Sequence, residues 1–191
     1  MSKEVSDMRD TDSMTAEIAQ LRGKIAQLQE HVDQLYQLAH QDTLINLPNR
    51  RGFIRELERL IARVARYGDN AAMLFVDLNG LKMINDTFGH RAGDEALIQV
   101  ADLLSAGIRE SDVVARIGGD EFGILLENAN EESAHETATR LVDQICASEL
   151  VHDGHALPLS VAIGVAMITP EDNCDSVIAR ADLEMYRRKA A

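Results

Sequence analysis

The sequence has no long apolar run, and this shortage bears on membrane association and export. No apolar stretch approaches the ~20 residues that a membrane-spanning helix needs. The N-terminal segment MSKEVSDMRDTDSM has no apolar core of the kind found in signal peptides. We therefore expect a cytoplasmic chain that does not engage a membrane.

Cysteine is also scarce, with Cys146 and Cys174 as its two copies. Neither belongs to a CxxC motif, and no cluster of histidines accompanies them. This usage argues against a disulfide framework and against a structural zinc site. We interpret both residues as buried or incidental thiols.

Positive charge is in deficit, because 19 Lys and Arg residues face 32 Asp and Glu residues, for a net charge of −13. Proteins that bind DNA or RNA need a basic face, so we expect no nucleic-acid partner. A nucleotide ligand remains compatible with this charge. A metal ion and a few local cations can neutralise a triphosphate inside an acidic protein.

Residues 1–39 carry a heptad pattern of apolar residues and are predicted to form a helical stalk. The a positions are Ile18, Ile25, Val32 and Ala39, and the d positions are Leu21, Leu28 and Leu35. Branched residues at a with Leu at d favour a parallel two-stranded coiled coil, and hence a homodimer. The alternative is a single amphipathic helix that packs on its own domain.

Residues 40–191 are predicted to form one α+β domain. A helix is expected after Pro48, and from residue 71 the pattern alternates between strands and helices. The expected strands are 71–77, 112–117, 121–127 and 159–168, and the expected helices are 94–108, 132–148 and 174–190, with a short helical turn over 81–88. This order corresponds to the ferredoxin-like split βαβ arrangement found in nucleotide cyclases and polymerase palms.

Three carboxylates stand at the ends of strands that this topology makes neighbours. Asp77 ends the first strand, and Asp120 and Glu121 follow Gly118-Gly119 in the hairpin between the next two. Converging carboxylates repel one another unless a cation lies between them. Their hard oxygen atoms suit Mg²⁺, with Mn²⁺ as an alternative.

The run from Asp77 to Asp94, DLNGLKMINDTFGHRAGD, is dense in polar groups. Lys82 is a candidate to neutralise phosphate, and Asn85 with Asp94 can together bind the edge of a guanine base. Gly89 and Gly93 allow the backbone to approach a ligand closely. Taken singly, Asp94 also fits the N-cap of the following helix.

Four spaced motifs in residues 40–191 resemble the GGDEF-type diguanylate cyclases. They are RIGGDEF at 116–122, the run from Asp77 to Asp94, D-x-L-x-x-L-x-N-R from Asp42 to Arg50, and A-D-x-x-x-Y-x-x-K from Ala181 to Lys189. The resemblance implies that two GTP molecules are joined into cyclic di-GMP with release of two pyrophosphates. Because the product has two equivalent halves, each subunit of a dimer can hold one GTP.

The resemblance also implies roles for individual residues. It assigns Mg²⁺ to Asp77, the Leu78 carbonyl, Asp120 and Glu121, catalysis to Asp120, Glu121 and Lys82, and GTP binding to Asn85, His90, Asp94 and Lys189. Asp120 matches the position often given as proton acceptor from the 3′-hydroxyl, although a bound metal could equally lower the pKa of that hydroxyl.

Arg109 and Asp112 form an RxxD motif that ends five residues before Gly118. The resemblance implies a site there for inhibition by cyclic di-GMP, whereas a surface ion pair is the ordinary alternative. A GGDEF module that binds GTP or cyclic di-GMP without catalysis, another nucleotide cyclase and a simple coiled-coil interaction protein are the competing functions. A regulatory protein bound to the stalk is a further hypothesis.

Overall fold

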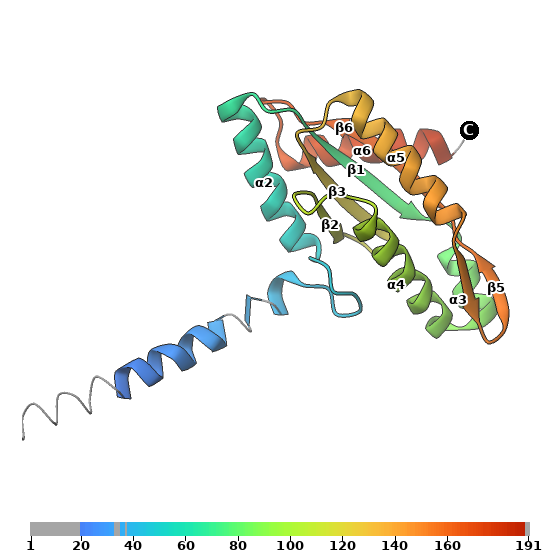
Figure 1. Cartoon of the computed structure of the whole chain (residues 1–191), viewed down its shortest axis with the longest axis horizontal. Coiled ribbons are helices and arrows are strands. Elements are labelled where there is room, and N and C mark those ends of the chain that lie inside the picture. The colour runs from blue at the N-terminus through green and yellow to red at the C-terminus, as the bar shows by residue number, and fades with distance from the viewer. Residues whose placement is uncertain (1–19, 33–34, 37, 190–191) are drawn as a thin grey trace, which may run out of the picture. The chain divides into compact units, whose positions relative to one another are not determined.

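The computed structural model describes residues 20–32, 35–36 and 38–189, and the chain divides into two units, 1–39 and 40–191. In the first unit, residues 20–32 are helical (Figure 1). Their heptad side chains are half exposed or more: Leu21, Ile25, Leu28 and Val32, together with Leu35. Ile18 lies outside the described residues, and the coiled coil stays a prediction. In the part of the chain that the structure describes, no helix combines the length and apolarity needed to cross a membrane.

The second unit is built on a four-stranded antiparallel sheet with the order β2-β3-β1-β6. The strands are β1 (Ala71–Leu78), β2 (Val113–Arg116), β3 (Glu121–Glu127) and β6 (Val161–Met167). This order is that of the ferredoxin-like split βαβ fold, so the predicted α+β class is confirmed. The strand β1 lies between β3 and β6. Its end therefore lies beside the connection between β2 and β3, residues 116–122, which we call the signature hairpin.

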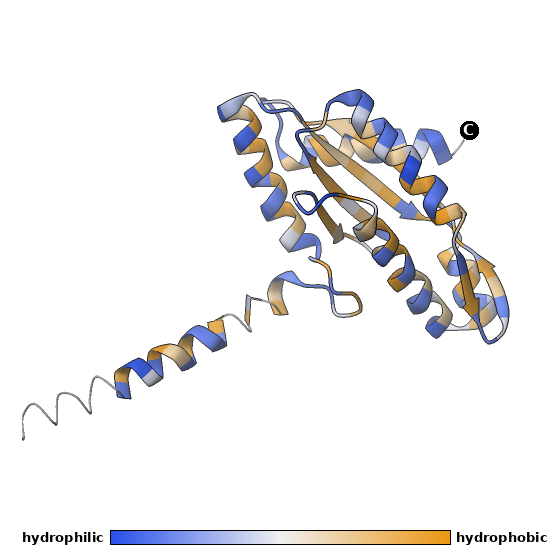
Figure 2. Cartoon of the chain, viewed as in Figure 1, coloured by the Kyte–Doolittle hydropathy of each residue, from blue (hydrophilic) through white to orange (hydrophobic). Residues whose placement is uncertain are grey.

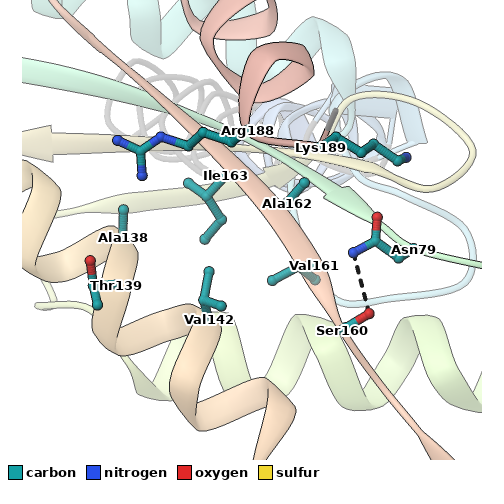
Figure 3. Close-up of a pocket in the computed structure, with 10 residues that line it drawn as sticks. All are labelled: Asn79, Ala138, Thr139, Val142, Ser160, Val161, Ala162, Ile163, Arg188 and Lys189. Carbon is teal, nitrogen blue, oxygen red and sulfur yellow. Dashed lines mark hydrogen bonds between the residues drawn. The ribbon is translucent and has the colours of Figure 1, made fainter. Parts of the chain in front are cut away.

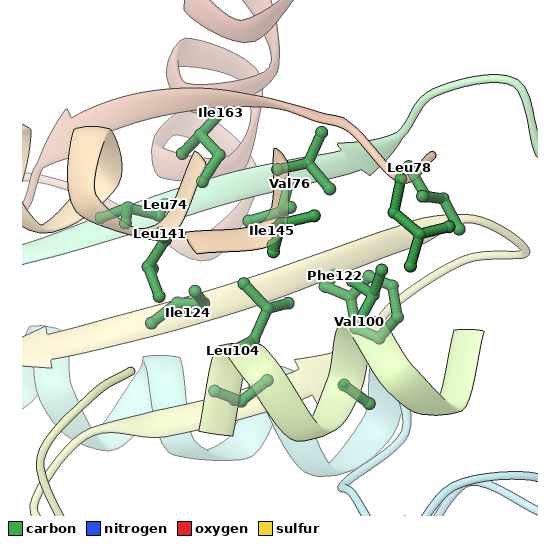
Figure 4. Close-up of a cluster of buried hydrophobic side chains, with 14 of the residues drawn as sticks. Leu74, Val76, Leu78, Val100, Leu104, Phe122, Ile124, Leu141, Ile145 and Ile163 are labelled. Atoms are coloured by element: carbon green, nitrogen blue, oxygen red, sulfur yellow. The ribbon is translucent and has the colours of Figure 1, made fainter. Parts of the chain in front are cut away.

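Helices cover both faces of the sheet (Figure 1). They are α2 (Arg50–Tyr67), α3 (Leu81–Phe88), α4 (His90–Ala106), α5 (Glu131–Cys146) and α6 (Cys174–Lys189). Alternate residues of β1 enter two separate cores. Leu74 and Val76 join the core under α4 and α5 (Figure 4), whereas Met73 and Phe75 join the core under α2 and α6.

The helix α2 shows how local sequence sets these elements. Asn49 caps its start by accepting hydrogen bonds from the amides of Arg51 and Gly52, and Gly68 ends it with a φ of 71°. Its apolar residues gather on one side, as the alternating colours of the helices show (Figure 2). That side is buried through Phe53 and Leu57.

A short hairpin between α5 and β6 was not expected from the sequence. It consists of β4 (Glu149–His152) and β5 (His155–Pro158), which pair with each other in a separate two-stranded sheet. Asp153 and Gly154 form its turn with φ values of 47° and 79°. Two successive positive φ values are typical of the tight turns that Asp-Gly favours, so that dipeptide was the signal available in the sequence.

The helix α4 begins at His90, four residues before the predicted start at 94. Asp94 is therefore an internal residue of the helix, and the suggestion that it serves as the N-cap is wrong. Gly89 takes that position with a φ of 86° and supplies no side-chain cap. The freedom of glycine at positive φ lets α3 end and α4 begin at one residue.

The helix α6 covers part of the free edge of β6. The guanidinium of Arg180 donates to the carbonyl of Met167 at 2.7 Å, and Glu184 accepts from the amide of Val165 at 2.7 Å. Unpaired edge groups are templates for pairing with another chain. Side chains of α6 thus satisfy backbone groups where a further strand would otherwise bind.

Asp172 fixes the start of α6, and Asp172→Asn is expected to lower the free energy of unfolding by about 1–2 kcal/mol at pH 7. Burial opposes ionisation, but hydrogen bonds from Arg180, Thr169 and Ser176 outweigh it and lower the pKa of Asp172 to about 2. This stability is present above the ordinary pKa near 4 and is lost as the pH falls through about 2. Urea unfolding of both proteins at pH 7 and pH 3 measures it, and the difference between them should be smaller at pH 3. An equal difference at the two pH values would contradict this origin.

Candidate active site

The predicted carboxylates lie where β1 ends and β3 begins. Asp77 is the register partner of Glu121 across these two strands. The amide of Leu78 donates to the carbonyl of Asp120 at 2.9 Å, which fixes the hairpin to the end of β1. The sheet therefore brings together the four positions to which the metal was assigned.

The electrostatics of Glu121 indicate a crowded acidic site. Burial raises the pKa of Glu121, and repulsion from Asp120, Asp77 and Asp182 raises it further, while Arg50 acts in the opposite direction. The side chain of Glu121 lies over Gly118, where any Cβ would overlap its carboxylate. Glycine at 118 is therefore required for this position of Glu121.

The donor chemistry of this cluster suits a hard divalent cation, since it offers carboxylates and backbone carbonyls. In the described ranges, no three acidic, histidine or cysteine side chains converge closely enough to form a ready-made metal site. Asp77 and Glu121 are adjacent by register, and the assignment of metal ligands to them stays a prediction.

Lys189 reaches this cluster from the end of α6. Its ammonium lies 2.5 Å from Oδ1 of Asp77, although 112 residues separate the two in sequence. The side chain of Asp77 is 15% exposed and that of Lys189 is 42% exposed. A cation is thus held beside the carboxylates at the position from which Lys189 was predicted to reach phosphate.

The predicted guanine-binding residues come together where α3 packs on α4. Asn85 of α3 lies directly against Gly93 of α4, where a Cβ would overlap the side-chain amide. Asp94 is the next residue along α4 and is exposed. Gly93 therefore lets Asn85 approach α4 next to the position of Asp94, and joint binding of one base edge by the two residues stays a prediction.

Lys82 and His90 lie at the first turns of α3 and α4 respectively, and both are exposed. Their side chains are accessible to a ligand. The sequence analysis expected the second helix to begin at 94, so the place of His90 within α4 was not predicted, and the roles of both residues stay predictions.

Arg116 belongs to the RIGGDEF motif, but the sequence analysis gave it no role. The structure shows that it makes structural contacts. Its guanidinium donates to the carbonyl of Gly119 at 2.7 Å and to the carboxylate of Asp42 at 3.2 Å. Its own amide donates to the carbonyl of Pro48. Arg116 thus connects the signature hairpin to the 41–49 segment. Asp42 and Arg116 are 74 residues apart, so no local pattern indicated the pair.

Arg109 and Asp112 lie in the turn between α4 and β2 and line a cavity of about 80 Å³. Asp112 accepts from the amides of Arg109 and Glu127 at 3.0 and 3.1 Å, so its carboxylate also holds the turn together. Arg140 of α5 lines the same cavity. Sequence reasoning missed Arg140, because its helix is distant along the chain and carries no motif.

A larger cavity of about 570 Å³ lies between α5, β6 and the end of α6 (Figure 3). Among the predicted site residues, Lys189 lines it, whereas the carboxylates Asp77, Asp120 and Glu121 do not. The acidic cluster and its ion pair with Lys189 therefore lie outside the lining of this cavity, apart from Lys189 itself, and the catalytic role of the carboxylates stays a prediction.

The sequence model of the family described as "Diguanylate cyclase, GGDEF domain" matches residues 39–191. The chain belongs to the GGDEF diguanylate cyclase family. Diguanylate cyclase TpbB of Pseudomonas aeruginosa is 35% identical over 181 residues, which are 93% of this chain and 41% of that protein. Probable diguanylate cyclase DgcE of Escherichia coli is 36% identical over 157 residues, covering 82% of this chain and 14% of its own length. This GGDEF chain thus spans less than half of these relatives.

Solved structures agree with this GGDEF fold. The coiled coil and GGDEF domain of DgcB from Caulobacter crescentus, in complex with c-di-GMP, superposes with a TM-score of 0.86 at 27% identity, covering 93% of this chain and 95% of that one. Diguanylate cyclase SiaD of Pseudomonas aeruginosa, in complex with its activator SiaC, gives a TM-score of 0.76 at 25% identity, covering 98% and 76%.

Proposed function

We propose that this chain is a Mg²⁺-dependent diguanylate cyclase that condenses two GTP molecules into cyclic di-GMP as a homodimer. The observation that carries the proposal is the pairing of Asp77 with Glu121 at the end of β1, beside the Asp120 hairpin and the ammonium of Lys189. Family membership and the named cyclases among its relatives support the same activity.

Each residue group has a separate task in this proposal. Asn85 and Asp94 bind the guanine edge, and Lys82 and Lys189 offer their ammonium groups to the phosphates. Bound Mg²⁺, held by the carboxylates and the Leu78 carbonyl, would lower the pKa of the attacking hydroxyl and neutralise charge on the phosphates. A carboxylate of the signature hairpin accepts the proton of the 3′-hydroxyl.

The stalk brings together the two half-sites, one on each subunit of the homodimer. Its exposed Leu and Ile side chains repeat every three or four residues, as a coiled-coil surface requires. A parallel coil would hold two catalytic units at one end, at an effective concentration of roughly mM order. The structure of DgcB, named for its coiled coil and GGDEF domain, supports this arrangement, and the SiaD–SiaC complex supports a regulatory partner.

The test is the conversion of GTP to cyclic di-GMP and pyrophosphate by purified protein, cleared of bound nucleotide, with Mg²⁺. We expect the specific rate to rise with protein concentration until the dimer is saturated, because each product needs two half-sites. Binding of guanine nucleotide without turnover at any concentration would favour the receptor function instead.

Arg109→Ala is expected to raise the concentration of cyclic di-GMP that halves the activity roughly tenfold, because a hydrogen bond to a charged group contributes about 1.5–3 kcal/mol. Arg140→Ala is expected to act in the same direction, since both cations line one cavity. Initial rates with added cyclic di-GMP measure the effect. Arg51→Ala, an exposed change on α2, is the control. Unchanged inhibition in Arg109→Ala would contradict a product site here.

A further inference from the structure

The β4–β5 hairpin packs against the two helices that hold the guanine-binding residues. Leu150 and Leu157 are buried in the same core as Ile84 of α3 and Leu97 of α4. The hairpin thus shares one apolar core with the α3–α4 corner, the region around Gly89 where α3 ends and α4 begins. The hairpin also makes polar contacts, which have defined partners and lie at the same corner.

His152 makes the central polar contact. Among the described residues it is the one polar or charged residue classed as buried, at 7% exposed. Its Nδ1 lies 2.7 Å from Oε2 of Glu95 on α4. Its Nε2 faces Asp153 at 3.6 Å, and Glu95 also receives a hydrogen bond from Arg91. The hydrogen bond with His152 lowers the pKa of Glu95, so the carboxylate stays ionised.

Two more contacts tie the hairpin to this corner. The amide of Gln99 on α4 donates to the carbonyl of Glu149 at 3.3 Å. The ring of His155 lies 5.9 Å from that of Phe88, the last residue of α3. The hairpin therefore contacts both helices, α3 at its end and α4 at its second and third turns.

These contacts matter because the link between α3 and α4 is a single residue. Gly89 ends α3 and precedes His90, with a φ of 86°. Glycine restricts the angle between two helices less than any other residue, so packing has to fix it. Asn85 lies four residues before this link, and Asp94 lies directly before Glu95.

We propose that His152 is a positioning residue for guanine recognition: through Glu95 it fixes α4, and hence Asp94, relative to Asn85. This inference rests on the guanine-binding role given to Asn85 and Asp94 in the proposed function. His152 itself does not contact the nucleotide. Loss of its hydrogen bond lets Asp94 move relative to Asn85. The affinity for guanine nucleotide should therefore fall by a larger factor than the rate of the chemical step.

The test uses 3′-deoxy-GTP, which lacks the attacking hydroxyl, and 3′-deoxy-ITP, which also lacks the 2-amino group. In His152→Phe, which keeps the bulk but not the hydrogen bond, we expect the Kd for 3′-deoxy-GTP to rise about tenfold, the factor that corresponds to one such bond. The preference for 3′-deoxy-GTP over 3′-deoxy-ITP should fall by a similar factor. With GTP, KM should rise while kcat changes less than twofold.

Matched variants separate positioning from general damage. His152→Gln restores a donor to Glu95 and is expected to recover most of the binding. Glu95→Gln removes the negative charge of the hydrogen-bond partner of His152, on a residue that is more exposed than His152. It is expected to raise the Kd for 3′-deoxy-GTP about threefold without unfolding the protein. Val151→Ala changes an exposed neighbour on the same strand and should leave every value unchanged.

Unchanged 3′-deoxy-GTP affinity and unchanged base preference in His152→Phe and Glu95→Gln would overturn the inference. If His152→Phe does not fold, Glu95→Gln decides it alone. If the proposed function is wrong, wild type binds 3′-deoxy-GTP but makes no cyclic di-GMP. The positioning role of His152 can still be measured in that case from the Kd values for the two analogues. A wild type that binds neither analogue would overturn both.

Discussion

Asp77→Asn and Glu121→Gln are each expected to lower the rate of cyclic di-GMP formation roughly 10²–10³-fold, the loss typical when a group that stabilises developing charge is removed. Both carboxylates stand at the junction of β1 and β3, and both replacements keep the size of the side chain. Product formation with Mg²⁺ at saturating GTP measures the loss.

The same two variants should keep the fold, and Glu121→Gln should unfold at a slightly higher temperature than wild type. Burial and neighbouring carboxylates raise the pKa of Glu121, so its ionised form destabilises the folded protein at neutral pH. Asp102→Asn, an exposed acid on α4, is the control and should change neither rate nor stability. Retained activity in Asp77→Asn and Glu121→Gln would move the reaction away from this strand junction.

Gly164→Ala is expected to lower the free energy of unfolding by about 3 kcal/mol, at the upper end of the cost of overpacking. A Cβ at this position of β6 would overlap the backbone of α6 at Ala181 and Met185. Backbone cannot rotate away as a side chain can, so the helix has to shift as a whole. Urea unfolding followed by circular dichroism measures the difference.

Two other glycines provide graded controls for Gly164→Ala. Gly123→Ala meets the ring of Phe53, a side chain that can adjust, so its loss of stability should be smaller. Gly119→Ala meets no atom within 4 Å and has no positive φ, so its stability should stay close to wild type. Equal stability of Gly164→Ala and wild type would show that α6 does not pack on β6 as closely as described.

The sheet and its helices were predictable because apolar residues form short continuous runs in the strands and one-sided patterns in the helices. The apolar runs in AAMLFVD and EFGILLE and the apolar face of α2 needed no tertiary information. The start of α4 was placed too late because Gly89 offers no capping side chain, whereas Asp94 resembles one. The β4–β5 hairpin was missed because its strands are four residues long and its apolar positions are few.

The candidate site was predictable where sequence motifs carry it and not where distant residues meet. Asp77, Asp120 and Glu121 sit at strand ends that the topology brings together. His152 and Arg140 depend on contacts between separate helices and strands, which leave no periodic mark in the sequence. Such pairings follow only from the packed structure.

The link between Asp42 and Arg116 has a practical consequence for protein engineering. A truncated or fused protein that begins at residue 50 would retain every helix and strand of the catalytic unit but would lose the counter-ion of Arg116. It would also lose the Pro48 carbonyl that holds the start of the signature hairpin and Ile45, which is buried in the core. The smallest useful fragment therefore begins at residue 40, and fusions to other dimerising helices should be joined before that point.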